Sequence, residues 1–124
     1  MKKIRVFFEI ISMESKTRFD TDGEYKDNRL RFIDPEGDIN YIICKENIVE
    51  YYKKGTVDMK YIFNLDQVTK GYYGIQGNRF DFQIVTHILN VDEDEIYVKY
   101  DLYQSEDLVN KTELRIGCKY KEES

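Results

Sequence analysis

The chain has 124 residues, of which 41% are hydrophobic and 35% charged, a balance typical of one folded domain and not of a disordered chain. Its formal net charge is −5 at pH 7. An acidic chain lacks the basic face that displaces phosphate counterions, so the composition argues against nucleic-acid binding and against docking on an anionic membrane.

Apolar side chains recur at every second position along most of the chain, which predicts β-strands and no long helix. The clearest case is the set Val57, Met59, Tyr61 and Phe63, which shares one face. Ten strands are predicted in chain order, over 2–13, 17–26, 28–34, 38–45, 47–54, 56–63, 67–75, 79–91, 95–104 and 109–120. Segment 67–71 also fits a helical turn, which leaves the strand there open.

Turn signals separate these runs. The segment Asp34-Pro35-Glu36-Gly37 has Pro at the second position of a turn, and Gly77-Asn78 fits a two-residue hairpin loop. The pattern predicts an all-β fold, a single antiparallel up-and-down β-barrel of about 8–10 strands. One domain extends over 1–124, with only 121–124 expected to fray. A two-layer sandwich has the same alternation and remains an alternative.

The two cysteines, Cys44 and Cys118, belong to no CxxC pair. The apolar run at the start is broken by Glu9, which does not fit a secretory signal. No stretch approaches the roughly 20 apolar residues of a membrane-spanning helix. These features predict a cytoplasmic protein with both thiols free.

Family landmarks are spread over nearly the whole chain. They are Gly23-Glu24-Tyr25 followed by Leu30, Gly55-Thr56-Val57-Asp58-Met59 running to Phe63, Phe80 with Thr86, and Tyr100-Asp101-Leu102 followed by Asn110. In these landmarks the sequence resembles the YwiB-like proteins, an uncharacterised family of small bacterial proteins with a lipocalin-like (calycin-type) β-barrel. That family often carries Arg just before the glycine equivalent to Gly55, where this chain has Lys53-Lys54. The resemblance implies barrel closure and a cytoplasmic bacterial protein, and it supplies neither an activity nor catalytic residues.

The sequence offers little for catalysis. His87 is the single histidine, and its position in the alternation predicts a solvent-facing side chain. Cys118 shares the inward parity of Leu114 and Ile116, which predicts an inert buried thiol. The acidic segment 92–95 is expected to be a solvated hairpin tip and not a calcium loop. We therefore expect no enzyme, no catalytic residue, no metal and no cofactor.

The barrel interior is the remaining candidate site, because barrels of this size can enclose one small ligand. The inward parity is apolar and aromatic, with hydroxyl groups at intervals. The predicted ligand-binding side chains are Tyr25, Tyr41, Met59, Tyr61, Phe80, Phe82, Thr86 and Tyr100. A packed core would show the same composition, and the sequence leaves both interpretations open.

Three functions follow from these observations. The first is a non-enzymatic binding barrel for a small apolar or aromatic molecule. The second is a solid-core barrel acting as a protein-interaction module or homodimer, through an exposed aromatic patch at Tyr51-Tyr52 or Tyr72-Tyr73. The third, an enzyme, requires two carboxylates such as those of Glu50 and Asp101 to converge in a cleft. No nucleic-acid or membrane partner is expected.

Overall fold

The computed structural model describes residues 2–120, so the expected frayed tail at 121–124 lies outside it. Ten strands follow one another along the chain. They are β1 (Lys2–Ile11), β2 (Lys16–Lys26), β3 (Arg29–Ile33), β4 (Ile39–Lys45), β5 (Ile48–Lys54), β6 (Val57–Asn64), β7 (Thr69–Ile75), β8 (Asn78–Val91), β9 (Glu95–Gln104) and β10 (Asp107–Tyr120). The described part of the chain contains no helix long and apolar enough to cross a bilayer.

Every strand pairs antiparallel with its neighbours in the sequence, and β10 returns to pair with β1. This last ladder runs from Ile4 opposite Tyr120 to Ile11 opposite Glu113 and closes the barrel. The predicted all-β, up-and-down antiparallel barrel is thereby confirmed, with ten strands. The segment that also fitted a helical turn contributes strand β7.

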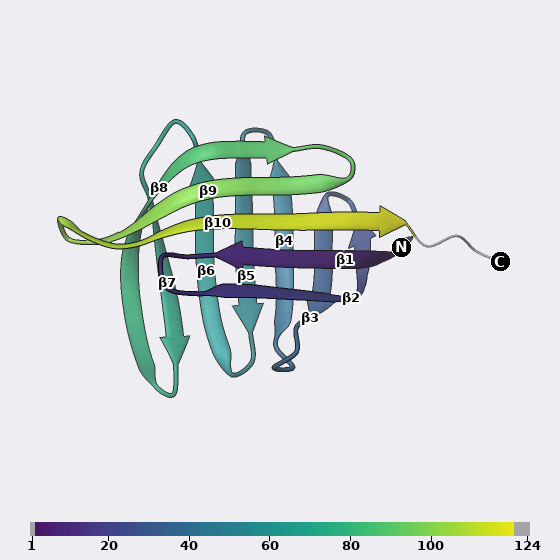
Figure 1. Ribbon diagram of the computed structural model, residues 1–124, viewed down its shortest axis with the longest axis horizontal. Coiled ribbons are helices and arrows are strands. Elements are labelled where there is room, and N and C mark those ends of the chain that lie inside the picture. The colour runs from purple at the N-terminus through teal and green to yellow at the C-terminus, as the bar shows by residue number, and fades with distance from the viewer. Residues whose placement is uncertain (1, 121–124) are drawn as a thin grey trace.

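The barrel is flattened into two layers whose strands cross at a steep angle (Figure 1). One layer contains β1, β2, β9 and β10, and the other contains β3 to β7. The long strand β8 bends from the second layer into the first, and its ladder with β9 shifts register between Thr86 and Ile88. A β-bulge increases the local bend of a strand, so this irregularity lies where the corner requires one.

Side chains fill the space between the layers. In β6 the predicted alternation holds, since Val57, Met59, Tyr61 and Phe63 are all buried. Aromatic rings form two clusters within this core. One stacks Phe8 on Phe19 with centroids 4.8 Å apart, and the other places the Phe63 ring 4.6 Å from that of Tyr100. Rings packed at these distances stabilise the centre of the barrel beyond their buried area.

Candidate functional site

Six of the eight side chains predicted to bind a ligand face the barrel interior. Met59, Tyr61, Thr86 and Tyr100 are buried in the core, and Tyr25 and Phe82 are half-buried against it. The Tyr61 ring centroid lies 6.4 Å from that of Phe82 and 6.2 Å from that of Tyr100. Tyr61 thus contacts both of the other rings, so this part of the interior is a packed core.

The predicted inward position of Tyr41 is wrong. In β4 the buried residues are Asn40 and Ile42, which leaves Tyr41 half-buried on the outer face. Asn40 decides which residues of β4 point inward. Its side-chain amide is fully buried, where it donates to Asp34 Oδ2 at 3.0 Å and accepts from the Tyr51 hydroxyl at 2.5 Å. A polar residue with buried partners takes the place that the apolar pattern assigned to the ring.

The predicted interior position of Phe80 is also wrong, for a different reason. Phe80 keeps the parity of Ile84 but is 45% exposed. It lies near the tip of the β7–β8 hairpin, opposite Tyr73, where the hairpin projects beyond the neighbouring strands (Figure 1). The alternation of side chains predicts which face of a strand a residue lies on. It does not predict whether neighbouring strands cover that part of the strand.

Thr86 carries an unpaired polar atom into the core. The residue is 6% exposed, and its Oγ1 has no hydrogen-bond partner among the described residues. A buried hydroxyl without a partner costs about 1–3 kcal/mol of folding free energy. It is a polar contact point that a ligand or water in the core would satisfy.

We expect Thr86→Val to raise the free energy of unfolding by about 1 kcal/mol, because a methyl group replaces the unpaired hydroxyl. Urea unfolding of both proteins measures the difference. A loss of stability in the variant would show that the hydroxyl has a partner in solution.

A cavity of about 560 Å³ opens at one end of the barrel, between the β2–β3 turn and the β8–β9 turn. We call it the mouth cavity. Its walls are inward-facing side chains, namely Ile4, Tyr25, Leu30, Cys44, Ile96 and Cys118. The Tyr25 hydroxyl donates to Asn28 Oδ1 at 3.0 Å. The cavity therefore has an apolar floor and a polar rim. The rim also includes the charged residues Lys2, Asp92, Glu93 and Glu95.

Both thiols of the chain line this mouth cavity and are free. Burial raises the pKa of the Cys44 thiol. Burial, with smaller contributions from Cys44 and Asp94, raises the pKa of Cys118 to about 11. Because the thiolate is the nucleophile, these cysteines are unreactive at neutral pH and behave as small apolar wall residues.

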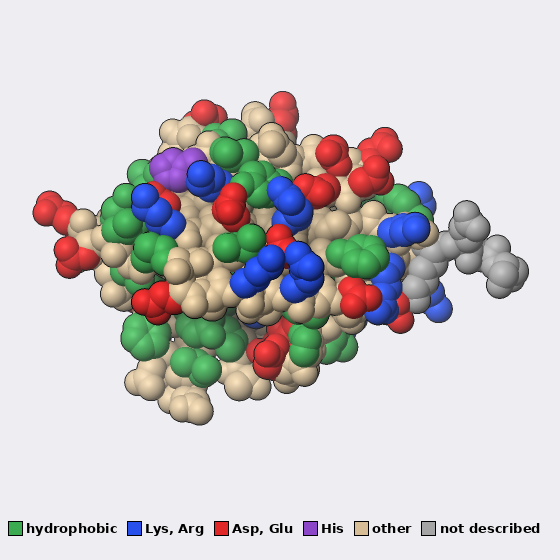
Figure 2. Space-filling view, viewed as in Figure 1, with side chains coloured by type: hydrophobic (Ala, Val, Ile, Leu, Met, Phe, Trp, Pro, Cys, Tyr) green, Lys and Arg blue, Asp and Glu red, His purple; other side chains and the backbone are tan. Residues whose placement is uncertain are grey.

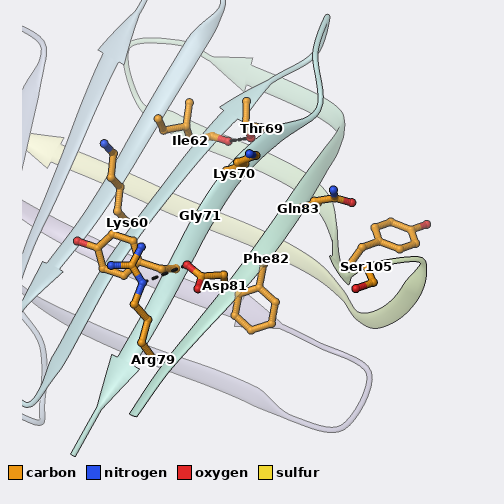
Figure 3. A pocket seen from close by; sticks show the side chains of 12 residues that line it. Lys60, Ile62, Thr69, Lys70, Gly71, Arg79, Asp81, Phe82, Gln83 and Ser105 are labelled. Carbon is orange, nitrogen blue, oxygen red and sulfur yellow. Dashed lines mark hydrogen bonds and ion pairs between the residues drawn. The ribbon is translucent and has the colours of Figure 1, made fainter. Parts of the chain in front are cut away.

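A second hollow, of about 880 Å³, crosses the outer face of β6, β7 and β8 (Figure 3). We call it the outer groove. Strands β6 and β7 pair only from Val57–Ile75 to Lys60–Tyr72, and beyond that point the Thr69 hydroxyl donates to the Ile62 carbonyl oxygen. Lys60, Lys70 and Arg79 bring positive charge to the groove, and Asp81 brings one negative charge.

His87 lies on the outer surface, as its parity predicted, with 45% of its side chain exposed (Figure 2). It is the bulged residue of β8, and its Nε2 is 2.8 Å from Asp101 Oδ2. Asp101 is 8% exposed although its parity faces outward. The pair belongs to neither the mouth cavity nor the outer groove, so it stands apart from both candidate binding sites.

A buried polar network lies at the end of β3 and β4 opposite the mouth cavity. The Asp34 carboxylate accepts hydrogen bonds from the backbone N–H of Glu36 and Asp38 and from Asn40, and Lys53 Nζ lies 3.4 Å from it. Burial raises the pKa of Asp34, but these hydrogen bonds and the Lys53 charge outweigh it, so the pKa lies below its ordinary value. A carboxylate that is satisfied in this way holds the turn together.

The carboxylate of Asp38 extends this network to the β5–β6 turn. It accepts the backbone N–H of Thr56 at 2.6 Å and that of Val57 at 3.2 Å. Sequence reasoning missed Asp38, although the neighbouring Gly55 is a landmark of the resemblance. Within residues 2–120, no group of three or more His, Cys, Asp or Glu side chains is placed to hold a metal ion.

Comparisons with known proteins agree with the fold. A family model described as a domain of unknown function (DUF1934) matches residues 6–116. The crystal structure of the YwiB protein from Bacillus subtilis superimposes with a TM-score of 0.76 at 16% identity, covering 98% of this chain and 93% of that one. At this identity the superposition is evidence of a shared fold alone. No curated protein matches the chain.

The family match takes in strands β2 to β9 and most of β1 and β10, and it leaves Ile4 and Cys118 of the mouth cavity outside its range. Together with the closed barrel, it confirms the resemblance drawn from the landmark residues. The chain therefore belongs to the DUF1934 family of YwiB-like proteins, whose lipocalin-like β-barrel it shares.

Proposed function

We propose that this protein is a non-enzymatic binding barrel that holds a small apolar or aromatic molecule in its mouth cavity. The carrying observation is a hollow of about 560 Å³ whose floor is formed by inward-facing apolar side chains and whose rim is polar and charged. Cavities of roughly 300–1,000 Å³ with a mainly apolar lining and a few polar groups are the usual form of small-molecule sites.

The proposed binding site lies further out than the side-chain alternation suggested, because packed rings occupy the core. Tyr61, Phe82 and Tyr100 fill the region that parity assigned to the ligand, and of the eight predicted side chains only Tyr25 lines the mouth. Burial, with smaller contributions from Cys44, Tyr120 and Cys118, raises the pKa of Tyr25. Its hydroxyl therefore stays protonated and is a polar contact for one group of the ligand.

The test uses naphthol as a neutral aromatic probe and the two thiols as reporters. Bound naphthol is expected to slow alkylation of Cys44 and Cys118 by iodoacetamide at pH 9 by roughly ten-fold, which mass spectrometry of the peptides measures. Alkylation that proceeds equally fast with and without saturating naphthol would contradict binding at the mouth.

Two variants at one position supply the matched control. Cys118→Met fills part of the mouth cavity with a flexible apolar side chain, so naphthol binding should weaken by roughly ten-fold. Cys118→Ala enlarges the cavity instead and should leave binding intact. Amide chemical shifts of the labelled protein follow both titrations, and equal affinities in the two variants would place the probe elsewhere.

A further inference from the structure

A row of aromatic and basic side chains crosses the outer face of the second layer. Directly opposed residues on adjacent strands lie on the same face of a sheet. Arg31 is opposite Tyr41, Tyr41 is opposite Tyr52, Tyr52 is opposite Lys60, and Lys60 is opposite Tyr72. Five neighbouring strands thus present one continuous row, which ends in the outer groove.

Two of the three cations of the groove lie over aromatic rings. Lys60 Nζ is 6.0 Å from the centroid of the Tyr52 ring, and Arg79 Cζ is 4.1 Å from that of Tyr72. Arg79 Nε also donates to Asp81 Oδ1 at 3.1 Å, an interaction that Figure 3 marks beside the ring. A guanidinium above a ring offers its own planar surface to a further aromatic group, and its remaining N–H groups are donors for an anion.

The local charge of the groove is opposite to that of the whole chain. Lys60, Lys70 and Arg79 contribute three positive charges and Asp81 one negative charge, whereas the chain carries −5. The one acid among these lining residues is paired with Arg79. Glu50 on the neighbouring strand β5 is paired with Lys45 and is also attracted to Lys60, so Lys70 and the remaining field of Lys60 attract an anion. A cleft lined by one sign of charge concentrates ligands of the other sign, even on a protein of unfavourable net charge.

We propose that the outer groove binds a nucleotide, with its base stacked on the Tyr72–Arg79 pair and its phosphates at Lys60 and Lys70. The groove volume of about 880 Å³ suits a small molecule. The aromatic rings suit a planar base, whereas an acidic peptide would use only the positive charges. The proposed site lies on the outer face and shares no lining residue with the mouth cavity. The net charge of the whole chain disfavours nucleic acid, but it does not describe the local charge of this face.

The experiment is an amide chemical-shift titration of the whole chain with adenosine triphosphate, inorganic phosphate and a thymidine decanucleotide. Adenosine triphosphate is expected to shift the amides of Lys60, Lys70, Tyr72 and Arg79 and to bind more tightly than phosphate. If the decanucleotide binds roughly ten-fold more tightly than the triphosphate, the natural ligand is a nucleic-acid strand. If it binds equally or more weakly, the natural ligand is a free nucleotide.

Variants separate the two parts of the proposed site. Lys60→Gln with Lys70→Gln should weaken triphosphate binding by roughly ten-fold or more. Tyr72→Leu should weaken triphosphate binding while leaving phosphate binding unchanged, since only the base uses the ring. A control with the same charge loss is Lys3→Gln with Lys99→Gln, both exposed and outside the groove.

Three results would overturn the proposal. The first is the absence of shifts at the groove amides with millimolar triphosphate. The second is equal weakening in the groove and control double variants, which would show a response to net charge alone. The third is an oligoglutamate peptide that binds the groove as tightly as the triphosphate does, which would assign the groove to an acidic protein partner.

Discussion

Replacing Gly55 by alanine is expected to remove about 3 kcal/mol or more of stability, a large part of what a small domain has. Gly55 has φ +148°, where a side chain strains the backbone, and a Cβ there would overlap the Asp38 carboxylate. Displacing that carboxylate breaks its charge-assisted hydrogen bonds to Thr56 and Val57, which are worth about 1.5–3 kcal/mol each. Urea unfolding monitored by circular dichroism measures the loss.

Gly77 is the matched control for this prediction. It also has a positive φ, +78°, but an added Cβ would meet nothing within 4 Å. Gly77→Ala should therefore cost only the backbone strain, about 1 kcal/mol. Equal losses in the two variants would mean that the overlap with Asp38 has no part in the effect.

Alkaline pH is expected to unfold the barrel cooperatively between about pH 10 and 12. Burial raises the pKa of Tyr51, Tyr61 and Tyr100 well above its ordinary value, so these hydroxyls stay protonated in the folded chain. In the unfolded chain they lose their protons near pH 10. Above that pH the unfolded state binds fewer protons, so the free energy of unfolding falls by up to about 4 kcal/mol per pH unit for three such groups.

Tyrosinate absorbance and circular dichroism, recorded together against pH, test this expectation. The exposed tyrosines should titrate first, and the buried ones should ionise together with the loss of strand signal. Tyr61→Phe should raise the pH of unfolding, whereas Tyr120→Phe, at a position 47% exposed in the native chain, should leave it unchanged. Titration of all 11 tyrosines near pH 10 with the strand signal intact would contradict burial of the three rings.

The structure gives a packing or hydrogen-bonding role to some of the landmark residues that carry the family resemblance. A Cβ on Gly23 would lie 2.8 Å from Val6 Cγ2 and 2.9 Å from the Arg31 carbonyl oxygen, so only glycine lets β2 pass there. Asn110 Oδ1 accepts the backbone N–H of Met13 and ties β10 to the β1–β2 turn. Residues of this kind specify the barrel and do not by themselves specify what it binds.

The sequence by itself determined the strands and their order. Alternation with period two is a local property, because adjacent side chains of a strand point to opposite faces, and so it located all ten strands. Short connections then made sequence neighbours into neighbours in the sheet. The apolar walls of the mouth follow from the same parity, as Leu30 and Cys118 show.

Only the tertiary structure decided what depends on residues far apart in the chain. Pairing of β10 with β1 distinguishes a barrel from a sandwich, and no local pattern encodes that ladder. The buried partners of Asn40 turned Tyr41 outward, and the projecting hairpin exposed Phe80. The outer groove arises in the same way, because Lys60, Tyr72 and Arg79 come together only through the registers of three strands. Local alternation specifies a face, whereas long-range pairing specifies which side chains meet on it.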